Sequence, residues 1–186
     1  MAFSIDDIKA KLEFDGTRPS LFNIALTLPD SLQYGNKGLF NSKLEFLCHA
    51  ASIPVTTVAA IEVPYFGRKI KIAGNRTYPE WTITIFNDED FALRDAFEAW
   101  LNAINDARGN IRNSGVDSRP GTYKTNALVR ALPKDDASER IRRYKFEGMF
   151  PTEVSPIELN WATENEIASF TVNLAYDIWT IDTAQE

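Results

Sequence analysis

The sequence has one cysteine and one histidine, which removes most of the chemistry that these residues support. One cysteine cannot form an internal disulfide, and one histidine cannot build a metal cage or complete a recognisable catalytic motif. Cys48 lies in the alternating run LEFLCHAAS, so we expect a small buried core residue on a strand. It should share one side of that strand with Leu44, Phe46 and Ala50. We expect His49 to be an ordinary strand residue.

Motifs for cofactors and for bond-making chemistry are also missing. The sequence has no phosphate-binding loop, no dinucleotide fingerprint and no paired cysteines. Glu158, Glu164 and Glu166 could in principle form an acid and base pair, but solvated strand residues are the ordinary interpretation. The acids at 88–90 lack a partnered histidine and regular ligand spacing, which argues against a metal site. The sequence therefore predicts a protein that is not an enzyme, with no catalytic, cofactor-binding or metal-binding residues.

No apolar run approaches the length of a bilayer span, so we predict no transmembrane helix and no membrane partner. The first residues, MAFSIDDIKAKLEFDG, have neither the basic leader nor the apolar stretch of a secretory signal, and we expect assembly in a cytoplasm. The 186 residues suffice for one substantial core and are few for two domains, so we expect a single domain over 1–186.

The formal net charge of −6 argues against a protein whose main task is to bind nucleic acid. Basic residues still gather in two clusters: Arg68, Lys69, Lys71 and Arg76, and then Arg140, Arg142, Arg143 and Lys145. In the second cluster, strand alternation puts Arg142 and two aromatic residues on one face and Arg143 and Lys145 on the other. No single stacking platform for bases results. We expect solvated strand faces, or salt bridges to acidic surfaces of neighbouring subunits.

The segment from Gly67 to Glu89, GRKIKIAGNRTYPEWTITIFNDE, is the most informative part of the chain. Isoleucines alternate with lysines over 69–72, and apolar residues alternate with threonines over 81–85. Gly74-Asn75 between these runs is a turn signal. The segment therefore predicts a strand, a turn and a second strand, followed by a helix.

The helix is predicted from Asp88 to Arg108, where apolar residues recur at helical spacing. These residues are Leu93, Ala96, Phe97, Trp100, Leu101 and Ile104. Asn87 or Asp88 could accept hydrogen bonds from the first free amides, and the acids at 88–90 suit the positive end of the helix dipole. We therefore attribute the acidic triplet to capping. Gly109 is the expected left-handed stop.

Short alternating strands account for most of the remaining chain. They are expected at 22–28, 44–52, 55–63, 122–132, 141–150, 157–161 and 170–178, with a hairpin between the second and third. A short first helix should be capped by Ser4, with Ile5, Ile8 and Leu12 on one face, and polar loops are expected at 29–38, 109–121 and 133–139. The predicted fold class is mainly β: an antiparallel β-sandwich or barrel with one packed α-helix.

The motifs NRTYPEWTITIFNDE, GMFPTEV and LNW together resemble those of the tail tube proteins of contractile-tailed bacteriophages. The resemblance extends to an opening strand at 18–22, a hairpin at 43–63 and closing strands at 144–179, and so covers most of the chain. The departures are an extended polar loop around 29–41 and a tail after Trp179.

The resemblance implies a structural virion protein of the tail. Members of that family form hexameric rings that stack helically into a hollow tube, inside a contractile sheath, through which the genome leaves the particle. The implied partners are further copies of this chain and the tail sheath, baseplate and tail terminator proteins, with no cofactor. Strands of adjacent subunits would pair edge to edge and close into one inner β-barrel. DNA would pass a bore of acidic and neutral side chains without specific binding.

Subunit contacts are expected in the hairpin at 53–67, in the basic turn that follows it and in the acidic cap. The candidate interface residues are Arg68, Lys69, Lys71, Arg76, Asp88, Glu89 and Asp90. The terminal segments 1–17 and 180–186 are candidates for contacts between stacked rings.

Three other functions remain open from the sequence. A tube of a related contractile injection or secretion apparatus would share the fold but pass protein cargo. A monomeric ligand-binding barrel would use the many aromatic residues to line a cavity. An enzyme of unrecognised type is the most distant alternative, because no residues specify its reaction.

Overall fold

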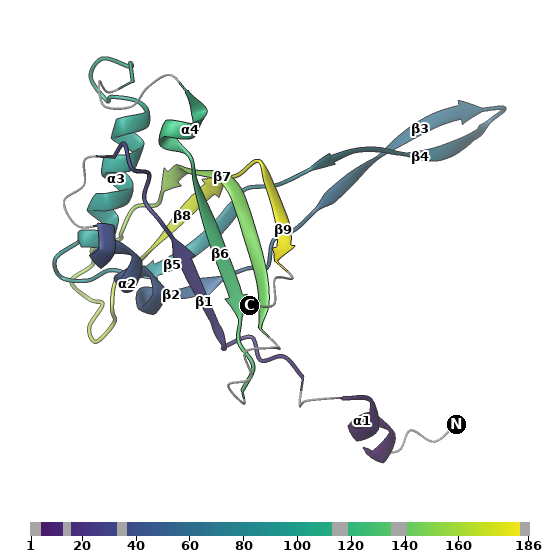
Figure 1. The fold of residues 1–186 in the computed structure, drawn as a ribbon, viewed down its shortest axis with the longest axis horizontal. Coiled ribbons are helices and arrows are strands. Elements are labelled where there is room, and N and C mark those ends of the chain that lie inside the picture. Colours follow the sequence, from purple (N-terminus) through teal and green to yellow (C-terminus); the bar gives the residue numbers. More distant parts are fainter. Residues whose placement is uncertain (1–4, 13–15, 33–36, 113–118, 135–140, 183–186) are drawn as a thin grey trace.

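The computed structural model describes residues 5–12, 16–32, 37–112, 119–134 and 141–182. Within these ranges the chain has nine strands and four helices (Figure 1). The helices are α1 (Ile5–Lys11), α2 (Lys37–Leu47), α3 (Ala92–Ile104) and α4 (Pro120–Tyr123). The strands are β1 (Phe22–Leu26), β2 (Cys48–Ala51), β3 (Thr57–Tyr65), β4 (Arg68–Thr77), β5 (Trp81–Phe86), β6 (Thr125–Ala131), β7 (Arg142–Val154), β8 (Ser169–Ala175) and β9 (Ile178–Asp182).

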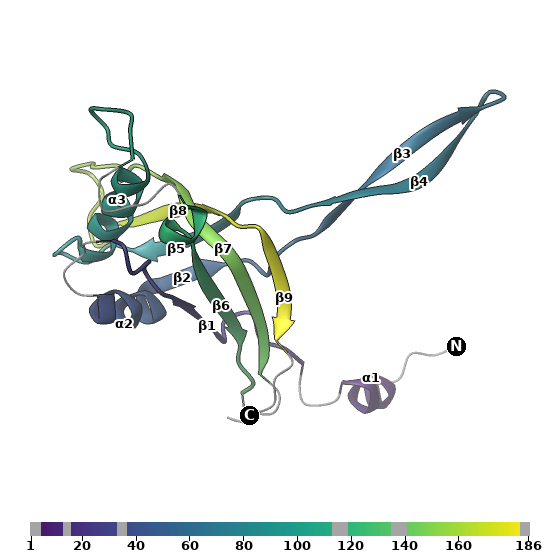
Figure 2. The same cartoon turned by 45° about the horizontal axis from the view of Figure 1, so that its top comes forward.

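Two antiparallel sheets share the long strand β7. Its first half pairs with β6 and β9, and β1 adds to β6, which makes the first sheet. Its second half pairs with β8, and β5 and β2 follow, which makes the second sheet. The strands of the second sheet run across those of the first, as Figure 2 shows. The mainly β, antiparallel fold predicted from the sequence is therefore confirmed.

The core lies between the inner faces of the two sheets. Alternate residues of each strand point inward, as the period of two requires. On β5 these are Trp81, Ile83 and Ile85, each at most 2% exposed, and β8 contributes Phe170, Val172 and Leu174 in the same way. The first sheet contributes Ile24, Leu26, Ala127, Val129 and Phe146. The predicted alternation at 22–28, 81–85 and 170–174 is confirmed.

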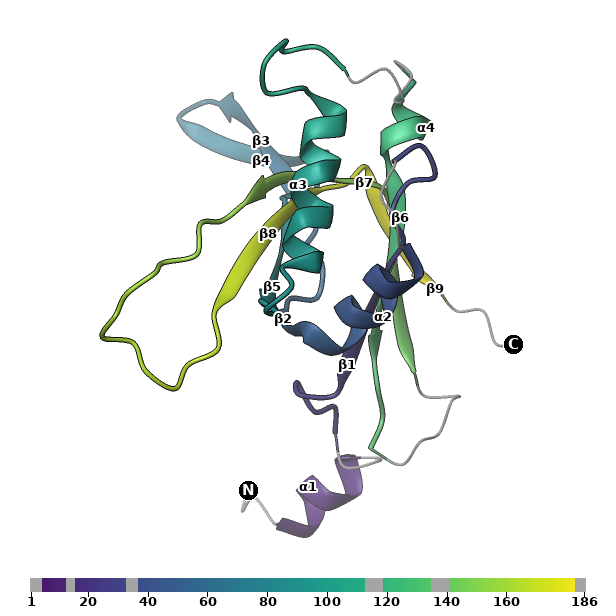
Figure 3. The ribbon, with the colours of Figure 1, turned by 90° about the vertical axis from the view of Figure 1, so that its left-hand side faces the viewer.

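Helix α3 covers the side on which the two sheets diverge (Figure 3). Leu93, Phe97 and Trp100 are buried as predicted, while Leu101 and Ile104 are only half-buried. Burying each large apolar side chain stabilises the fold by roughly 1.5–3 kcal/mol, so α3 belongs to the core. The Trp100 indole donates a hydrogen bond of 2.8 Å to the carbonyl of Tyr123, which satisfies its one polar group.

The predicted limits of this helix are wrong at both ends. It begins at Ala92, after Phe91, whose backbone lies in the left-handed region at φ 52°. It ends at Ile104, with Asn105 extended, so Gly109 is not its stop. The acids at 88–90 lie in the preceding connection, where the chain turns before the apolar helical face begins.

A second substantial helix, α2, occupies residues expected in a loop and a strand. Phe40 and Leu44 are buried four residues apart, which is the helical spacing, whereas Phe46 is 83% exposed. The strand expected over 44–52 is therefore confined to β2. Strand β2 pairs with β5, so the hairpin expected between 44–52 and 55–63 does not form.

Strands β3 and β4 form a long hairpin that leaves the body of the molecule (Figure 1). Its turn is Phe66-Gly67, where Gly67 has φ 77°, so the turn predicted at Gly74-Asn75 is wrong. Those two residues lie inside β4, opposite Ala59, where the register shifts as in a β-bulge. A Cβ on Gly74 would lie 2.9 Å from the Ala59 carbonyl oxygen. Glycine at position 74 therefore lets the backbone of β4 approach the backbone of β3 closely.

Three smaller expectations also differ from the structure. Residues 157–161 form no strand, and 155–168 is an irregular connection between β7 and β8. The last expected strand is divided at Tyr176-Asp177 into β8 and β9, and 120–123 is the short helix α4 rather than loop and strand. Ser4 and 135–140 lie outside the described residues.

Candidate assembly interface

One face of the β3–β4 hairpin is apolar and exposed. Ile61 lies opposite Ile72, and Val63 lies opposite Ile70, so strand alternation places all four side chains on one side of the ribbon. They are 40–54% exposed. We call these four residues the apolar face. A contiguous exposed apolar surface of this kind is typical of a site of interaction with another protein.

The opposite face of the hairpin is charged. Lys71 lies opposite Glu62, and Lys69 Nζ lies 2.6 Å from Glu62 Oε2. Arg68 lies opposite Tyr65 at the tip, on the side of the apolar face, and Arg76 lies near the base. The four basic residues predicted in one turn are therefore spread along β4 and over both faces of the ribbon.

The acidic triplet ties the connection before α3 to α2. Lys43 Nζ lies 2.8 Å from Asp88 Oδ2 and 2.5 Å from Asp90 Oδ2. Hydrogen bonds to Asp88 and then Asp90 raise the pKa of Lys43, and the bond from Lys43 lowers the pKa of Asp90. Asp90 Oδ1 also accepts a hydrogen bond of 3.1 Å from the Ala92 amide. The prediction that Asn87 or Asp88 caps the helix is wrong, because the N-cap residue is Phe91 and Asp88 Oδ1 accepts a hydrogen bond only from the adjacent Glu89 amide. The ion pairs with Lys43 are a role that the sequence did not indicate.

The outer face of the second sheet is polar and carries no basic residue on β5 or β8. Thr82 Oγ1 donates a hydrogen bond of 2.7 Å to Asn173 Oδ1, and Asn173 Nδ2 donates one of 3.0 Å to Glu153 Oε2. Thr84 lies opposite Thr171 on the same side. We call these five residues the threonine face.

The outer face of the first sheet differs from the threonine face because it carries the second basic cluster. Arg143 and Lys145 point away from buried Phe146, and Lys145 Nζ lies 3.0 Å from Glu147 Oε1. Arg142 lies on the other side of β7, where its Cζ atom is 5.9 Å from the centroid of the Tyr144 ring. The predicted division between two faces is confirmed. Arg140 lies outside the described residues.

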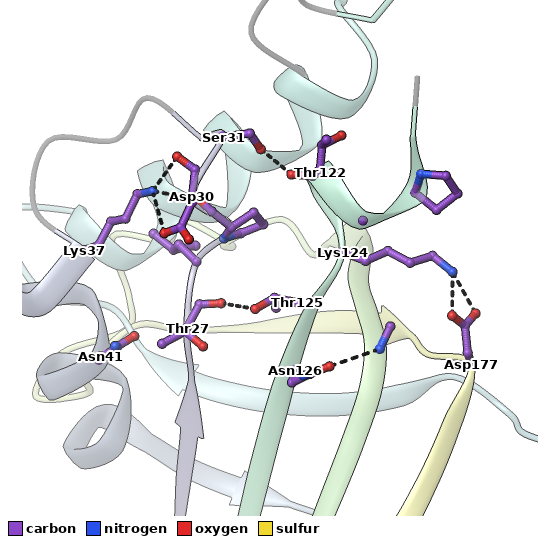
Figure 4. A pocket seen from close by; sticks show the side chains of 15 residues that line it. Thr27, Asp30, Ser31, Lys37, Asn41, Thr122, Lys124, Thr125, Asn126 and Asp177 are labelled. Atoms are coloured by element: carbon purple, nitrogen blue, oxygen red, sulfur yellow. Dashed lines mark hydrogen bonds and ion pairs between the residues drawn. The ribbon is translucent and has the colours of Figure 1, made fainter. Parts of the chain in front are cut away.

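A polar groove lies between the connection after β1, helix α4 and the bend of β7 (Figure 4). Lys124 Nζ lies 2.7 Å from both carboxylate oxygens of Asp177. Lys37 Nζ donates to the carbonyls of Pro29 and Asp30 at 2.8 and 2.9 Å, and the Ser31 hydroxyl donates to the Thr122 carbonyl. These contacts join the connection after β1 to α2 and α4. The groove therefore has a structural part in the fold.

The residues considered for chemistry have ordinary surroundings. Cys48 is buried, as predicted, and burial raises the pKa of its thiol to about 12. His49 is exposed on β2 and stacks on Phe86, with ring centroids 3.9 Å apart. Glu158, Glu164 and Glu166 lie in the exposed β7–β8 connection rather than on strands. The described ranges contain no group of three or more His, Cys, Asp or Glu residues that could hold a metal ion.

Aromatic side chains fill the core by packing on one another. Trp81 stacks on Phe146 with ring centroids 4.6 Å apart, and Phe40 meets the edge of Phe97 at 5.4 Å. A ligand-binding barrel would need such rings around a cavity, so their packing does not support that alternative. Among the described helices, none is both long and apolar enough to cross a membrane.

The family profile for the phage tail tube protein matches residues 17–182. The chain belongs to this family. Its sequence is 33% identical over 176 residues to the tail tube protein gp19 of Enterobacteria phage T4, covering 94% of this chain and 98% of that protein. It is 23% identical over 131 residues to the tail tube protein of Serratia phage KSP90, with 70% of each chain covered.

Two solved structures show the same fold at low sequence identity. The tube-terminating cap of the anti-feeding prophage has a TM-score of 0.62 and 20% identity, and the comparison covers 91% of this chain and 92% of that one. A chain in the sheath–tube complex of the extracellular contractile injection system PVC has a TM-score of 0.55 and 15% identity, with 98% and 100% covered.

Membership of the tail tube family confirms the central functional prediction. The chain is a structural protein of the virion tail and not an enzyme. The likeness to injection-system chains concerns the fold alone, while the relative with 33% identity comes from a phage with a contractile tail.

Two features of the surface were missed in the sequence. The apolar face was visible as alternation in IKI, but the turn was expected eight residues too late to pair Ile70 with Val63. The alternation of Ile157, Leu159 and Trp161 with polar residues predicts a strand at 157–161, whereas these residues lie in the irregular connection at 155–168. In the structure Leu159 and Trp161 are 90% and 101% exposed.

Proposed function

We propose that this tail tube protein polymerises as hexameric rings that stack into the hollow inner tube of a contractile tail, through which the viral genome is ejected. The apolar face of the β3–β4 hairpin is the observation that carries the proposal. A hairpin that projects from the body with four half-exposed aliphatic side chains requires a partner to bury them. Further copies of the same chain supply that partner in a tube.

The open edges of the sheets support the proposed closure of the ring. Within the described residues, β1 pairs with β6 alone and β2 pairs with β5 alone. Open edges of this kind favour pairing with another chain, and a closed barrel removes them. Each backbone hydrogen bond contributes only about 1 kcal/mol net, so the tube also depends on the apolar contacts.

The threonine face is the surface that we propose for the bore. Its side chains are neutral apart from Glu153, whereas the outer face of the first sheet carries Arg143 and Lys145. Basic residues attract phosphates without sequence preference, so a basic lining would retard DNA. A neutral and acidic lining lets DNA pass without specific binding.

The predicted interface residues remain proposals with revised roles. Arg68, Lys69, Lys71 and Arg76 belong to the projecting hairpin, so they suit contacts with acidic surfaces of other subunits. Asp88 and Asp90 already pair with Lys43 within the chain, so the exposed Glu89 is the member of the triplet best suited to a contact between subunits.

Other contacts are proposed from the termini and from the family. Helix α1 stands apart from the body in Figure 1, with Ile5 73% exposed, so 1–17 is a candidate for contact between stacked rings, together with 180–186. The similar solved chains come from assemblies that include a sheath and a tube-terminating cap. We propose sheath, baseplate and tail terminator proteins as partners of this chain.

Electron microscopy of the purified chain over a concentration series tests the proposal. Six-fold rings or hollow filaments are the expected result, and a three-dimensional reconstruction that resolves side chains shows which face lines the bore. A chain that stays monomeric, alone and after addition of purified tail baseplates as nuclei, would contradict it. A bore dominated by arginine and lysine would contradict the proposed lining alone.

A further inference from the structure

The connection between β7 and β8, residues 155–168, exposes three large apolar side chains. Leu159 is 90% exposed, Trp161 is fully exposed, and Ile167 is 69% exposed. An exposed tryptophan ring is unfavourable, because it leaves a large apolar area in contact with water. The segment also contains Glu158, Glu164 and Glu166 and no basic residue. We call residues 155–168 the acidic loop.

The fold holds the acidic loop at both ends. The Ser155 amide donates a hydrogen bond of 2.8 Å to the Thr171 carbonyl, and an Arg94 guanidinium nitrogen donates one of 2.9 Å to the Ser155 carbonyl. At the other end the Asn87 amide donates one of 2.7 Å to the Ala168 carbonyl. The loop is therefore attached to β8, to α3 and to the connection before α3, while Ile157 packs against the core and Leu159, Trp161 and Ile167 stay exposed.

The hairpin and the acidic loop have complementary surfaces. The hairpin, residues 57–77, carries four basic residues and one acid, Glu62, whereas the acidic loop carries three glutamates. Both surfaces also present exposed aliphatic or aromatic side chains, so a contact would bury apolar area and pair opposite charges. Arg68 lies at the tip on the side of the apolar face, so a glutamate of the loop could reach it while the rings and aliphatic groups pack.

The two surfaces lie at opposite ends of the molecule. In Figures 1 and 2 the hairpin projects to one end of the long axis, and the connection before β8 lies at the other. A chain therefore cannot place its own hairpin on its own acidic loop. A contact between two different patches on identical chains is head-to-tail, and such contacts generate rings or filaments.

Resting on the tube function proposed above, we propose that the apolar face of the hairpin of one copy binds the acidic loop of a second copy. Trp161 packs against Ile70 and Ile72 in this contact, and the glutamates of the loop pair with basic residues of β4. The ring of Trp161 is the central anchor, because buried tryptophans carry a large share of interface stability.

Removal of the Trp161 ring tests the contact in the full chain. The Trp161→Ser chain should fold normally, because the ring is fully exposed within the subunit. Its critical concentration, the lowest protein concentration that yields polymer, should rise at least about tenfold. Phe46→Ser is the matched control, since it removes an 83% exposed ring from α2, and its critical concentration should stay unchanged. Assembly of Trp161→Ser at the wild-type concentration would overturn the proposal.

Disulfide trapping locates the contact directly. Chains carrying Ala162→Cys and chains carrying Ile70→Cys are mixed, assembled and oxidised. They should form linked pairs in excess of a control mixture of Ala162→Cys and Ser42→Cys. Buried Cys48 can stay in place. Polymer without linkage above the control would overturn this contact and leave the tube function intact. A wild-type chain that forms no polymer, even with purified baseplates added as nuclei, would contradict the tube function itself.

Discussion

Gly148 and Asp177 lie in contact at the bend of β7, where the two sheets separate. Gly148 has φ 70°, and a Cβ at this position would overlap the carboxylate of Asp177. The Asp177 amide donates a hydrogen bond of 3.0 Å to the Glu147 carbonyl, and its carboxylate binds Lys124. The bend in β7 and the break between β8 and β9 thus occur side by side. This pair of residues lets one strand belong to both sheets.

Replacing Gly148 with alanine should destabilise the subunit by about 2–3 kcal/mol. The left-handed backbone costs about 1–2 kcal/mol for a residue with a Cβ, and displacement of Asp177 adds to it. Denaturant unfolding of the unassembled chain measures the effect. Gly121→Ala is the control, because nothing lies within 4 Å of a Cβ there and its φ is not positive. Equal stability of the two variants would contradict this account of the bend.

The Lys43 ion pairs predict a dependence of stability on pH. The pKa of Asp90 is lowered from its ordinary 3.8 by the hydrogen bond from Lys43 and then by the amide of Ala92. A carboxyl whose pKa is lowered by folding stabilises the fold above its unfolded pKa, and this contribution is lost as the pH falls through the folded value. Asp90→Asn should therefore lose less stability than wild type when the pH falls below 3.8.

Thermal unfolding of the unassembled chain between neutral and acid pH measures this difference. Asp95→Asn is the control, since it removes an exposed carboxylate in the first turn of α3. Lys43→Met should lower the melting temperature at neutral pH. It should also make the fall of the melting temperature at acid pH less steep than in wild type. If the melting temperatures of Asp90→Asn and wild type fall equally at acid pH, the pairing with Lys43 does not contribute to stability.

The predictable part of this fold was the part governed by buried alternation. Trp81, Ile83 and Ile85 have one side in the core and one in solvent, so the period of two fixes strand and face together. Helix α3 was predictable in the same way, because its buried residues recur with a period of 3.6. The residue at which it begins was not predictable, because Phe91 adopts a left-handed backbone that composition does not indicate.

The errors arose where alternation had another cause. In 44–48, Leu44, Phe46 and Cys48 alternate, but burial at Phe40 and Leu44 decides in favour of a helix. In 157–161, Leu159 and Trp161 are exposed and only Ile157 packs against the core, so the alternation does not mark a strand face within the subunit. Tertiary contacts override local pattern at these positions. The candidate interface residues stay predictions, because a contact between subunits depends on a second chain as well as on local pattern.

Cys48 should be unreactive in the folded chain. Burial raises the pKa of its thiol to about 12, so the nucleophilic thiolate is scarce at neutral pH, and access is blocked as well. Maleimide labelling followed by mass spectrometry should be slow in buffer and fast in denaturant. A Ser42→Cys chain, with an exposed thiol on α2, provides the control and should gain one fast label. Rapid labelling of Cys48 in the native chain would contradict its place in the core.

Charge reversal in the hairpin should weaken polymerisation at low salt. Arg68→Glu with Lys69→Glu removes two positive charges from the tip and leaves Glu62 beside another acid, which repels an acidic surface on a neighbouring copy. We expect a rise in critical concentration of about tenfold at low salt that diminishes at high salt, because exposed charges are screened beyond about 10 Å at 0.1 M ionic strength.

Arg108→Glu with Lys134→Glu makes the same change in net charge at exposed positions on the body and corrects for general repulsion. Sedimentation of polymer over a salt series measures both variants. If their critical concentrations rise equally, net charge rather than a specific hairpin contact controls assembly; a larger rise for the hairpin variant assigns the effect to the contact.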